Sequence, residues 1–272
     1  MKTFILGVGA QKSGSTWLYQ LFRSHPKMNM GFIKEYHVLD SLFIDKHKKI
    51  HRLVEKNKNE EAALLKVFLS DIEQYFNYFQ RLLNISPDTL FTGDLTPSYA
   101  GLDKEAFKLV KESFSQRGIN VKVIFIMRDP VERCISAVCH GLDRNGIEKT
   151  KSNIESELQS KFHSKNFQYR TKYNKTIMTL EQVFDRDQIF FGFYETLFSE
   201  NEMLRLSRFL NIDITSPPLN RVVNKHGTDA QICNQLKKEI ANYYKQTYEY
   251  MISRYGPEVI YMLWKNANLV DY

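Results

Sequence analysis

The sequence contains little cysteine. Its 272 residues include three, Cys134, Cys139 and Cys233, and none belongs to a CxxC pair. Small disulfide-stapled proteins need more thiols in paired spacings, and zinc sites usually show closely spaced Cys or His ligands. The sequence therefore predicts no disulfide framework and no metal site. The three thiols are expected to be small buried or half-buried side chains.

Long apolar runs are missing as well. No window comes near the roughly 20 apolar residues of a membrane span. The apolar run Phe4–Ala10 breaks into the polar Gln11-Lys12-Ser13, which is too early for a signal peptide. We expect this run to be a buried first strand, and we expect a cytoplasmic protein without a membrane span.

The chain also lacks repeats, low-complexity tracts and linkers rich in Pro or Gly. Residues 1–272 are enough for one large domain with its own core, so a single domain is expected. Lys plus Arg exceed Asp plus Glu by 38 to 31, a net charge of +7, which suits an anionic ligand. No Lys/Arg block resembles a nucleic-acid-binding arm, so no nucleic-acid partner is expected.

The apolar pattern alternates between strands and helices. Four buried strands are expected at Thr3–Val8, Thr89–Gly93, Val121–Met127 and Gln188–Phe193. Helical spacing is found in Thr16–Ser24, Glu60–Leu83, Lys104–Gln116, Val131–Cys139, Phe167–Phe184, Asn201–Leu210 and Ala230–Tyr255. Polar stretches near Asp143–Lys165 and Ile214–Asp229 are expected to be surface loops. The alternation predicts an α/β fold, a P-loop-like three-layer α/β/α domain with a central parallel sheet.

A loop suited to phosphate follows the first strand. Four residues separate Gly9 from Gly14, and a helix is expected directly afterwards. This geometry points backbone N–H groups and a helix N-terminus at an anion. The spacing matches the Walker A pattern, but Ser15 stands in place of its lysine, and Lys12 lies two residues before Gly14.

The displaced lysine suggests transfer without a metal ion. A sulfuryl group carries one net negative charge where a phosphoryl group carries two, so its transfer needs less neutralisation. One ammonium at the bridging oxygen, with backbone and hydroxyl donors, can then stand in for Mg²⁺. Lys12 is placed for that role, and a solvated lysine in a tight turn is the alternative.

The segment Gln11-Lys12-Ser13-Gly14-Ser15-Thr16-Trp17-Leu18 resembles the 5′-phosphosulfate loop of sulfotransferases that use 3′-phosphoadenosine 5′-phosphosulfate (PAPS). The resemblance implies that PAPS is the donor, that adenosine 3′,5′-bisphosphate is a product, and that no metal takes part. It assigns six residues to donor binding: Lys12, Ser13, Gly14, Ser15, Thr16 and Trp17.

A second family motif follows the strand Val121–Met127. The segment Arg128-Asp129-Pro130-Val131-Glu132-Arg133-Cys134-Ile135-Ser136 resembles the family's 3′-phosphate element. Pro130 suits the first turn of a helix, which places Ser136 two turns beyond Arg128 at a strand end where α/β sheets bind ligands. The resemblance implies that Arg128 and Ser136 bind the 3′-phosphate, and Arg133 is expected to support the helix.

Weaker matches extend the resemblance from about Phe4 to Gly227. Tyr194-Glu195-Thr196-Leu197 and the helix end at Asn211 are similar to family segments. The stretch Val223–Gly227 lies where relatives have a basic loop that closes over the nucleotide. This implies that Lys225 and Gly227 bind the donor, with an ordinary surface loop as the alternative.

The segment Lys34-Glu35-Tyr36-His37 is similar to one in carbohydrate sulfotransferases of the heparan-sulfate type, where the glutamate is the base. An acceptor hydroxyl loses its proton as it attacks, and a carboxylate in a partly desolvated cleft can take it. Glu35 is the expected catalytic base and His37 the rival. Lys34 is expected to steer anions or to pair with Glu35.

One segment departs from the family pattern. In Gly93-Asp94-Leu95-Thr96-Pro97-Ser98-Tyr99, Leu95 replaces a lysine that lies near the sugar in carbohydrate-type relatives. The expected acceptor therefore stays broad, a small molecule or a carbohydrate. Asp94 is expected to be a second acid or to orient Lys12 or Lys34, and Thr96 and Pro97 to fix the loop.

These motifs together predict an enzyme that moves a sulfuryl group from PAPS to an acceptor hydroxyl or amine. Transfer is expected to be in line and independent of metal, with Glu35 as base and Lys12 stabilising the leaving phosphate. Two alternatives are a P-loop kinase or NTPase and a catalytically inactive nucleotide-binding relative. Metal dependence and an activity assay, respectively, would reveal them.

Overall fold

A parallel sheet organises the part of the chain that the computed structural model describes, residues 1–44, 59–214 and 230–272. Within these ranges four strands lie in the order β2-β1-β3-β4. They are β1 Thr3–Gly9, β2 Phe91–Leu95, β3 Asn120–Met127 and β4 Ile189–Phe193. All neighbouring strands are parallel. The predicted fold class and the four predicted strands are confirmed, with shifts of at most two residues at their ends.

Two apolar clusters show that helices cover both faces of the sheet. Phe4 and Leu6 of β1 belong to one cluster, whereas Ile5, which lies between them, belongs to the other. Because successive strand residues point to opposite faces, each cluster fills the space between one face and its helices. The second cluster contains residues of α1 (Ser15–Arg23) and α11 (Glu200–Leu210), and the first contains residues of most of the other helices.

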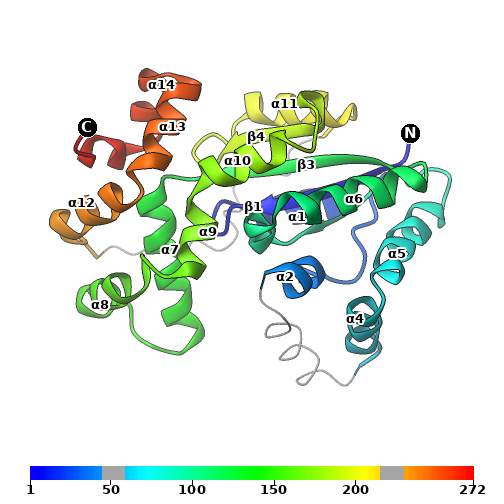
Figure 1. The fold of residues 1–272 in the computed structure, drawn as a ribbon, viewed down its shortest axis with the longest axis horizontal. Helices are drawn as coiled ribbons and strands as arrows, with labels where there is room; N and C mark the ends of the chain where they lie inside the picture. Colours follow the sequence, from blue (N-terminus) through cyan, green and yellow to red (C-terminus); the bar gives the residue numbers. More distant parts are fainter. Residues whose placement is uncertain (45–58, 215–229) are drawn as a thin grey trace.

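The remaining helices extend the domain at both ends of the sheet (Figure 1). Near one end lie α2 Val38–Phe43, α4 Glu60–Ser70 and α5 Ile72–Asn84. The middle of the chain forms α6 Lys104–Gln116, α7 Pro130–Arg144, α8 Lys151–Lys161, α9 Lys165–Thr171 and α10 Tyr173–Glu181. The C-terminal part holds α12 Asn234–Tyr243, α13 Lys245–Tyr255 and α14 Pro257–Leu263. Short 3₁₀ helices are η1 Pro97–Gly101, η2 Arg186–Gln188 and η3 Lys265–Leu269. Across the described ranges, no helix has the length and apolarity that a bilayer crossing requires.

Three helices predicted as continuous are each divided in two. The predicted helix Glu60–Leu83 ends at Asp71, whose extended backbone and side-chain bond to the Glu73 N–H begin a new helix. Lys172 separates α9 from α10, and Tyr244 separates α12 from α13. The apolar spacing continued across each break, so the pattern did not reveal it.

The prediction of a loop over Asp143–Lys165 is wrong, because α8 occupies its middle. Thr150 caps this helix by accepting a bond from the Asn153 N–H. Only Ile154 and Leu158 of α8 are buried, so its sequence is nearly as polar as a loop. Most of the other predicted loop, residues 215–229, lies outside the described residues.

Candidate active site

The phosphate loop joins β1 to α1 in the predicted strand–turn–helix order. Its backbone needs positive φ at Lys12 (68°) and Gly14 (87°). At Gly14 a Cβ atom would lie 2.5 Å from Leu197 Cδ2, so both the backbone and the neighbouring segment require glycine. No side chain caps the start of α1, which leaves its first N–H groups for an anion.

The hydroxyl groups of this loop fit a phosphate-containing donor. Ser13 is fully buried, yet its Oγ has no hydrogen-bond partner among the described residues. The hydroxyls of Ser15 and Thr16 accept bonds from Lys34 Nζ, at 3.1 and 3.0 Å. A buried hydroxyl without a partner beside an uncapped helix N-terminus is costly unless a ligand meets it.

Lys12 lies among positive charges. Burial, together with repulsion from Arg128 and Lys34, lowers its pKa to about 8. The concentration of cations at one end of β1 and β3 would bind a ligand with several negative charges.

The second predicted phosphate element lies directly beside the first. Arg128 follows β3 and donates from Nη1 to the Lys12 carbonyl at 3.2 Å. Its guanidinium carbon lies 4.4 Å from the ring centre of Tyr194. Glu132, one turn along α7, lies 3.8 Å from Arg128 Nη2. The Arg128 side chain is thus held at the loop where it could reach a phosphate.

Asp129 fixes this loop through a set of buried bonds. It caps α7 by accepting from the N–H groups of Val131 and Glu132. Tyr248 OH donates to Asp129 Oδ1, the same oxygen that accepts from the two N–H groups, at 2.9 Å. Asn266 donates to Asp129 Oδ2 from its backbone N at 3.0 Å and from Nδ2 at 3.1 Å. Sequence reasoning missed Tyr248 and Asn266, because nothing local connects them to a residue more than a hundred positions earlier.

Ser136 lies on α7 and is 6% exposed. No bond of its hydroxyl to another described residue is found, so it can donate to a ligand. Arg133 is fully buried on the same helix, with its guanidinium carbon 4.7 Å from the ring centre of Phe167. This supports the prediction that Arg133 stabilises the helix and its neighbours.

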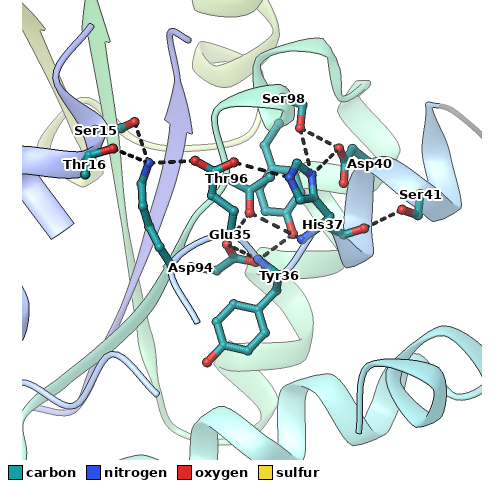
Figure 2. Close-up of polar contacts among 12 residues, drawn as sticks. Ser15, Thr16, Glu35, Tyr36, His37, Asp40, Ser41, Asp94, Thr96 and Ser98 are labelled. Atoms are coloured by element: carbon teal, nitrogen blue, oxygen red, sulfur yellow. Dashed lines mark hydrogen bonds and ion pairs between the residues drawn. The ribbon is translucent and has the colours of Figure 1, made fainter. Parts of the chain in front are cut away.

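A line of charged side chains runs from the phosphate loop across the predicted base (Figure 2). Lys34 Nζ lies 2.6 Å from Glu35 Oε1, and Glu35 Oε2 lies 3.3 Å from His37 Nε2. His37 Nδ1 lies 2.9 Å from Asp40 Oδ2, which also accepts a 2.5 Å bond from Ser98 Oγ. The expected pairing of Lys34 with Glu35 is therefore present, and charges alternate along the line.

These contacts set the protonation of Glu35 and His37. Burial alone would raise the pKa of Glu35, but bonds to His37 and Lys34 outweigh it and lower the pKa to about 2. Burial alone would lower the pKa of His37, but Asp40 and Glu35 raise it to about 9. At neutral pH Glu35 is ionised and His37 is protonated. Of the two side chains, only the Glu35 carboxylate then has lone pairs that can accept a proton.

Asp94 does not orient either lysine, and that prediction is wrong. It is fully buried and receives hydrogen bonds from four groups: Tyr75 OH at 3.0 Å, Tyr99 OH at 2.7 Å, Thr96 Oγ1 at 2.6 Å and Tyr36 N at 3.4 Å. Burial raises its pKa to about 6. Since Tyr36 lies between Glu35 and His37, Asp94 fixes the backbone that presents both. Thr96 fixes the loop as expected.

The other predicted site residues differ in placement. Trp17 is 6% exposed and packs edge-on against Phe198, with ring centres 5.1 Å apart. Lys225 and Gly227 lie outside the described residues. Sequence reasoning did not select Asp40 or Ser98. The three-residue spacing of His37 and Asp40 at a helix start was the available signal for Asp40, and Ser98 had none.

Metal-ligating groups do not gather in the described part of the chain. No set of three or more His, Cys, Asp or Glu side chains there has a metal-binding arrangement. Cys134 and Cys139 are buried free thiols, as expected, whereas Cys233 is exposed.

Comparisons with known proteins agree with this geometry. A family model described as "Sulfotransferase domain" matches residues 2–253. The crystal structure of a sulfotransferase from Alicyclobacillus acidocaldarius is similar, with a TM-score of 0.62 and 16% identity over 93% of this chain and 96% of that chain. At this identity the likeness shows the fold alone.

Two further solved structures are more distant. The sulfotransferase domain of the Synechococcus PCC 7002 olefin synthase has a TM-score of 0.47 and 19% identity, over 90% of this chain and 86% of that chain. The sulfotransferase domain of the curacin biosynthetic pathway has a TM-score of 0.48 and 18% identity, over 93% and 97%. No curated protein matches the sequence.

Proposed function

Because the chain belongs to the sulfotransferase-domain family of enzymes, whose donor is PAPS, we propose that Glu35 and Lys12 transfer a sulfuryl group from PAPS to an acceptor hydroxyl or amine. The observation that carries the proposal is the unbroken line of contacts from Ser15 and Thr16 through Lys34 to Glu35 (Figure 2). It joins a loop suited to the donor to a carboxylate suited to the acceptor. We take residues 1–272 as one sulfotransferase domain.

Donor binding would use both phosphate elements. The uncapped start of α1, the Ser13 hydroxyl and Lys12 would hold the 5′-phosphosulfate. Arg128, which directly follows β3, and the hydroxyl of Ser136, which lies about two turns farther along on α7, would hold the 3′-phosphate. PAPS supplies the sulfuryl group and is released as adenosine 3′,5′-bisphosphate.

Glu35 would act as the general base. Its carboxylate takes the acceptor proton while the acceptor oxygen or nitrogen forms its bond to sulfur. Lys12 neutralises the charge that develops on the bridging oxygen while the bond between sulfur and that oxygen breaks. The acceptor gains the sulfuryl group, and the proton ends on Glu35.

Lys34 would couple donor binding to the strength of this base. It is shared between Glu35 and the hydroxyls of Ser15 and Thr16. If Lys34 turns toward the donor, Glu35 loses one of its two cationic partners and its pKa rises from about 2. A stronger base would then be present only when the donor is bound, which would limit unproductive proton transfer.

His37 would orient Glu35 rather than serve as the base. Both ring nitrogens are occupied, by Glu35 and by Asp40, and its pKa is about 9. The sequence Lys34–His37 supports the glutamate-base mechanism of heparan-sulfate-type carbohydrate sulfotransferases, whereas Leu95 argues for a different acceptor environment. The acceptor class proposed is a small molecule or a carbohydrate.

The test is sulfate transfer from radiolabelled PAPS to a panel of glycan, phenol, alcohol and amine acceptors. Glu35→Gln should lower turnover by about 10²–10⁴-fold while adenosine 3′,5′-bisphosphate binds with unchanged affinity. Glu105→Gln, at an exposed position on α6, is the matched control and should be fully active.

A contrary outcome would be specific. If Glu35→Gln keeps nearly full turnover and His37→Ala is inactive, His37 is the base and the proposed acceptors shift toward small phenols or alcohols. If the parent protein transfers sulfate to no acceptor of the panel, the proposal that it is an active sulfotransferase for these acceptor classes is refuted.

A further inference from the structure

A cavity of about 300 Å³ lies between η1 and the pair of helices α9 and α10. One wall is formed by Ala100, Gly101 and Leu102. The Tyr169 ring packs directly on Gly101, since a Cβ on Gly101 would lie 2.7 Å from Tyr169 Cδ2. Its volume is at the lower end of the range for small-molecule sites, large enough for one charged group and a few attached atoms.

The opposite wall is built by a regular helical stripe. On α9 and the residue that follows it, the stripe consists of Lys165, Gln168, Tyr169 and Lys172, which are spaced three and four residues apart. Side chains at these spacings lie on one face of a helix. On α10 the stripe continues at the same spacing with Lys175, Thr176 and Thr179.

The stripe carries three lysines and no carboxylate. No Asp or Glu lines the cavity, and none of the three lysines forms an ion pair with a described residue. Burial lowers the pKa of Lys172, and repulsion by Lys175 lowers it further, with no acidic group acting in the opposite direction. Lys172 Nζ also lies 5.7 Å from the ring centre of Tyr243, but no carboxylate is among the lining residues, so three lysines line one cavity without a protein counterion.

The neutral groups of the wall already have partners. Gln168 donates to the His163 carbonyl and accepts from Lys172 Nζ. Thr176 donates to the Ala100 carbonyl, and Thr179 donates to the Lys175 carbonyl. The donors left for a ligand are the ammonium N–H groups, so the wall selects for negative charge rather than for hydroxyls or amides.

The cavity is close to the proposed catalytic line but separate from it. The helix η1 that forms one wall also carries Ser98, which bonds to Asp40. The neighbour of Tyr169 on α9, Arg170, is near enough for Asp40 and Glu35 to influence its pKa. The cavity therefore shares η1 and α9 with the surroundings of Asp40, but none of its lining residues belongs to the donor loops or to the line from Lys34 to Asp40.

We propose that this cavity is an oxyanion-binding site, distinct from the donor site, that takes a sulfate, phosphate or carboxylate group held by Lys165, Lys172 and Lys175. The group could belong to the acceptor or to a separate small anion. Only the acceptor source rests on the function proposed above, and the site itself does not.

Calorimetry with inorganic pyrophosphate tests the site. The protein is first saturated with adenosine 3′,5′-bisphosphate, so that the donor elements are filled. We expect saturable binding that weakens about tenfold or more in the double variant Lys172→Gln/Lys175→Gln. Affinity for the bisphosphate should not change. The control Lys27→Gln/Lys66→Gln removes two exposed lysines elsewhere and should bind pyrophosphate like the parent protein.

Three results would overturn the proposal. The first is that the parent protein shows no saturable binding of pyrophosphate. The second is that the control variant loses as much affinity as the cavity variant, and the third is that Lys34→Gln abolishes binding while the cavity variant retains it. The last result would place pyrophosphate at the catalytic line instead.

Steady-state kinetics then identify the source of the anion. Competitive inhibition by pyrophosphate against an anionic acceptor assigns the cavity to the acceptor, and inhibition or activation that leaves the acceptor KM unchanged assigns it to a separate anion. If no acceptor supports turnover, the calorimetric result still stands, so failure of the proposed function and failure of this site are distinguishable.

Discussion

Deprotonation of Lys12 should limit catalysis on the alkaline side. Burial, together with repulsion from Arg128 and Lys34, lowers its pKa to about 8. In the proposed mechanism Lys12 acts as an ammonium, so its contribution is complete below this pKa and is lost as the pH rises through it. Since kcat/KM reports the free enzyme, kcat/KM for PAPS should fall about tenfold for each pH unit above about pH 8.

Binding of the donor should shift this alkaline limit to higher pH. Negative charge close to Lys12 favours its charged form and raises its pKa, so kcat at saturating PAPS should fall only at higher pH than kcat/KM does. Lys12→Arg keeps the positive charge throughout, because the guanidinium does not deprotonate in this range. Its rate should be lower than that of the parent, since its planar fork differs from an ammonium, but its alkaline limb should be absent.

The assay is the initial rate of sulfate transfer at varied PAPS, from about pH 6 to about pH 10 at constant ionic strength. His37, with a pKa of about 9, is the competing origin for an alkaline limb. A parent profile that stays flat to the top of this range would refute the reasoning. A limb that is unchanged in Lys12→Arg would do so too, and would assign the limb to His37.

Three further outcomes are expected. Arg128→Ala should weaken adenosine 3′,5′-bisphosphate by about 10- to 100-fold in calorimetry and leave adenosine 5′-phosphate almost unchanged; equal losses for both nucleotides would contradict the 3′-phosphate assignment. Turnover should survive EDTA, and loss that Mg²⁺ reverses would favour kinase-like chemistry. Asn266→Ala should lower the free energy of unfolding by about 1–3 kcal/mol and weaken bisphosphate binding, because Asp129 loses a donor. Asn268→Ala, at an exposed position in the same 3₁₀ helix, should do neither, and a similar effect there would argue against the Asp129 contact.

The strands and both phosphate elements could be predicted because their signals are local. A run of apolar residues marks β1 and β3, and Gly9, Gly14 and Pro130 mark the turns that follow them. Local order in the chain also placed Lys34, Glu35 and His37 together. The positions of these strands, turns and side chains all depend on residues within about ten positions of one another, whereas their roles in binding and catalysis stay predictions.

The errors have a different physical origin. Asp94 was expected to orient Lys12 or Lys34 because Gly93–Tyr99 resembles a family segment, but tertiary packing surrounds its carboxylate with tyrosines from α5 and η1. The breaks at Asp71 and Lys172 are departures of single residues from helical backbone angles, which the apolar spacing does not encode. Asp40 and Ser98 became visible as a pair only once η1 lay beside α2.

The bond between Asn266 and Asp129 joins residues 137 positions apart. Closing so long a loop costs chain entropy, and the contact requires η3 to lie against the start of α7. The loop that carries Arg128 is therefore held in place by a contact with a residue that is very distant in the sequence. By mass action, a nucleotide that binds only the ordered loop also stabilises the docked C-terminal helices. Ligand concentration in the cell would then help to determine how much of this protein is fully folded.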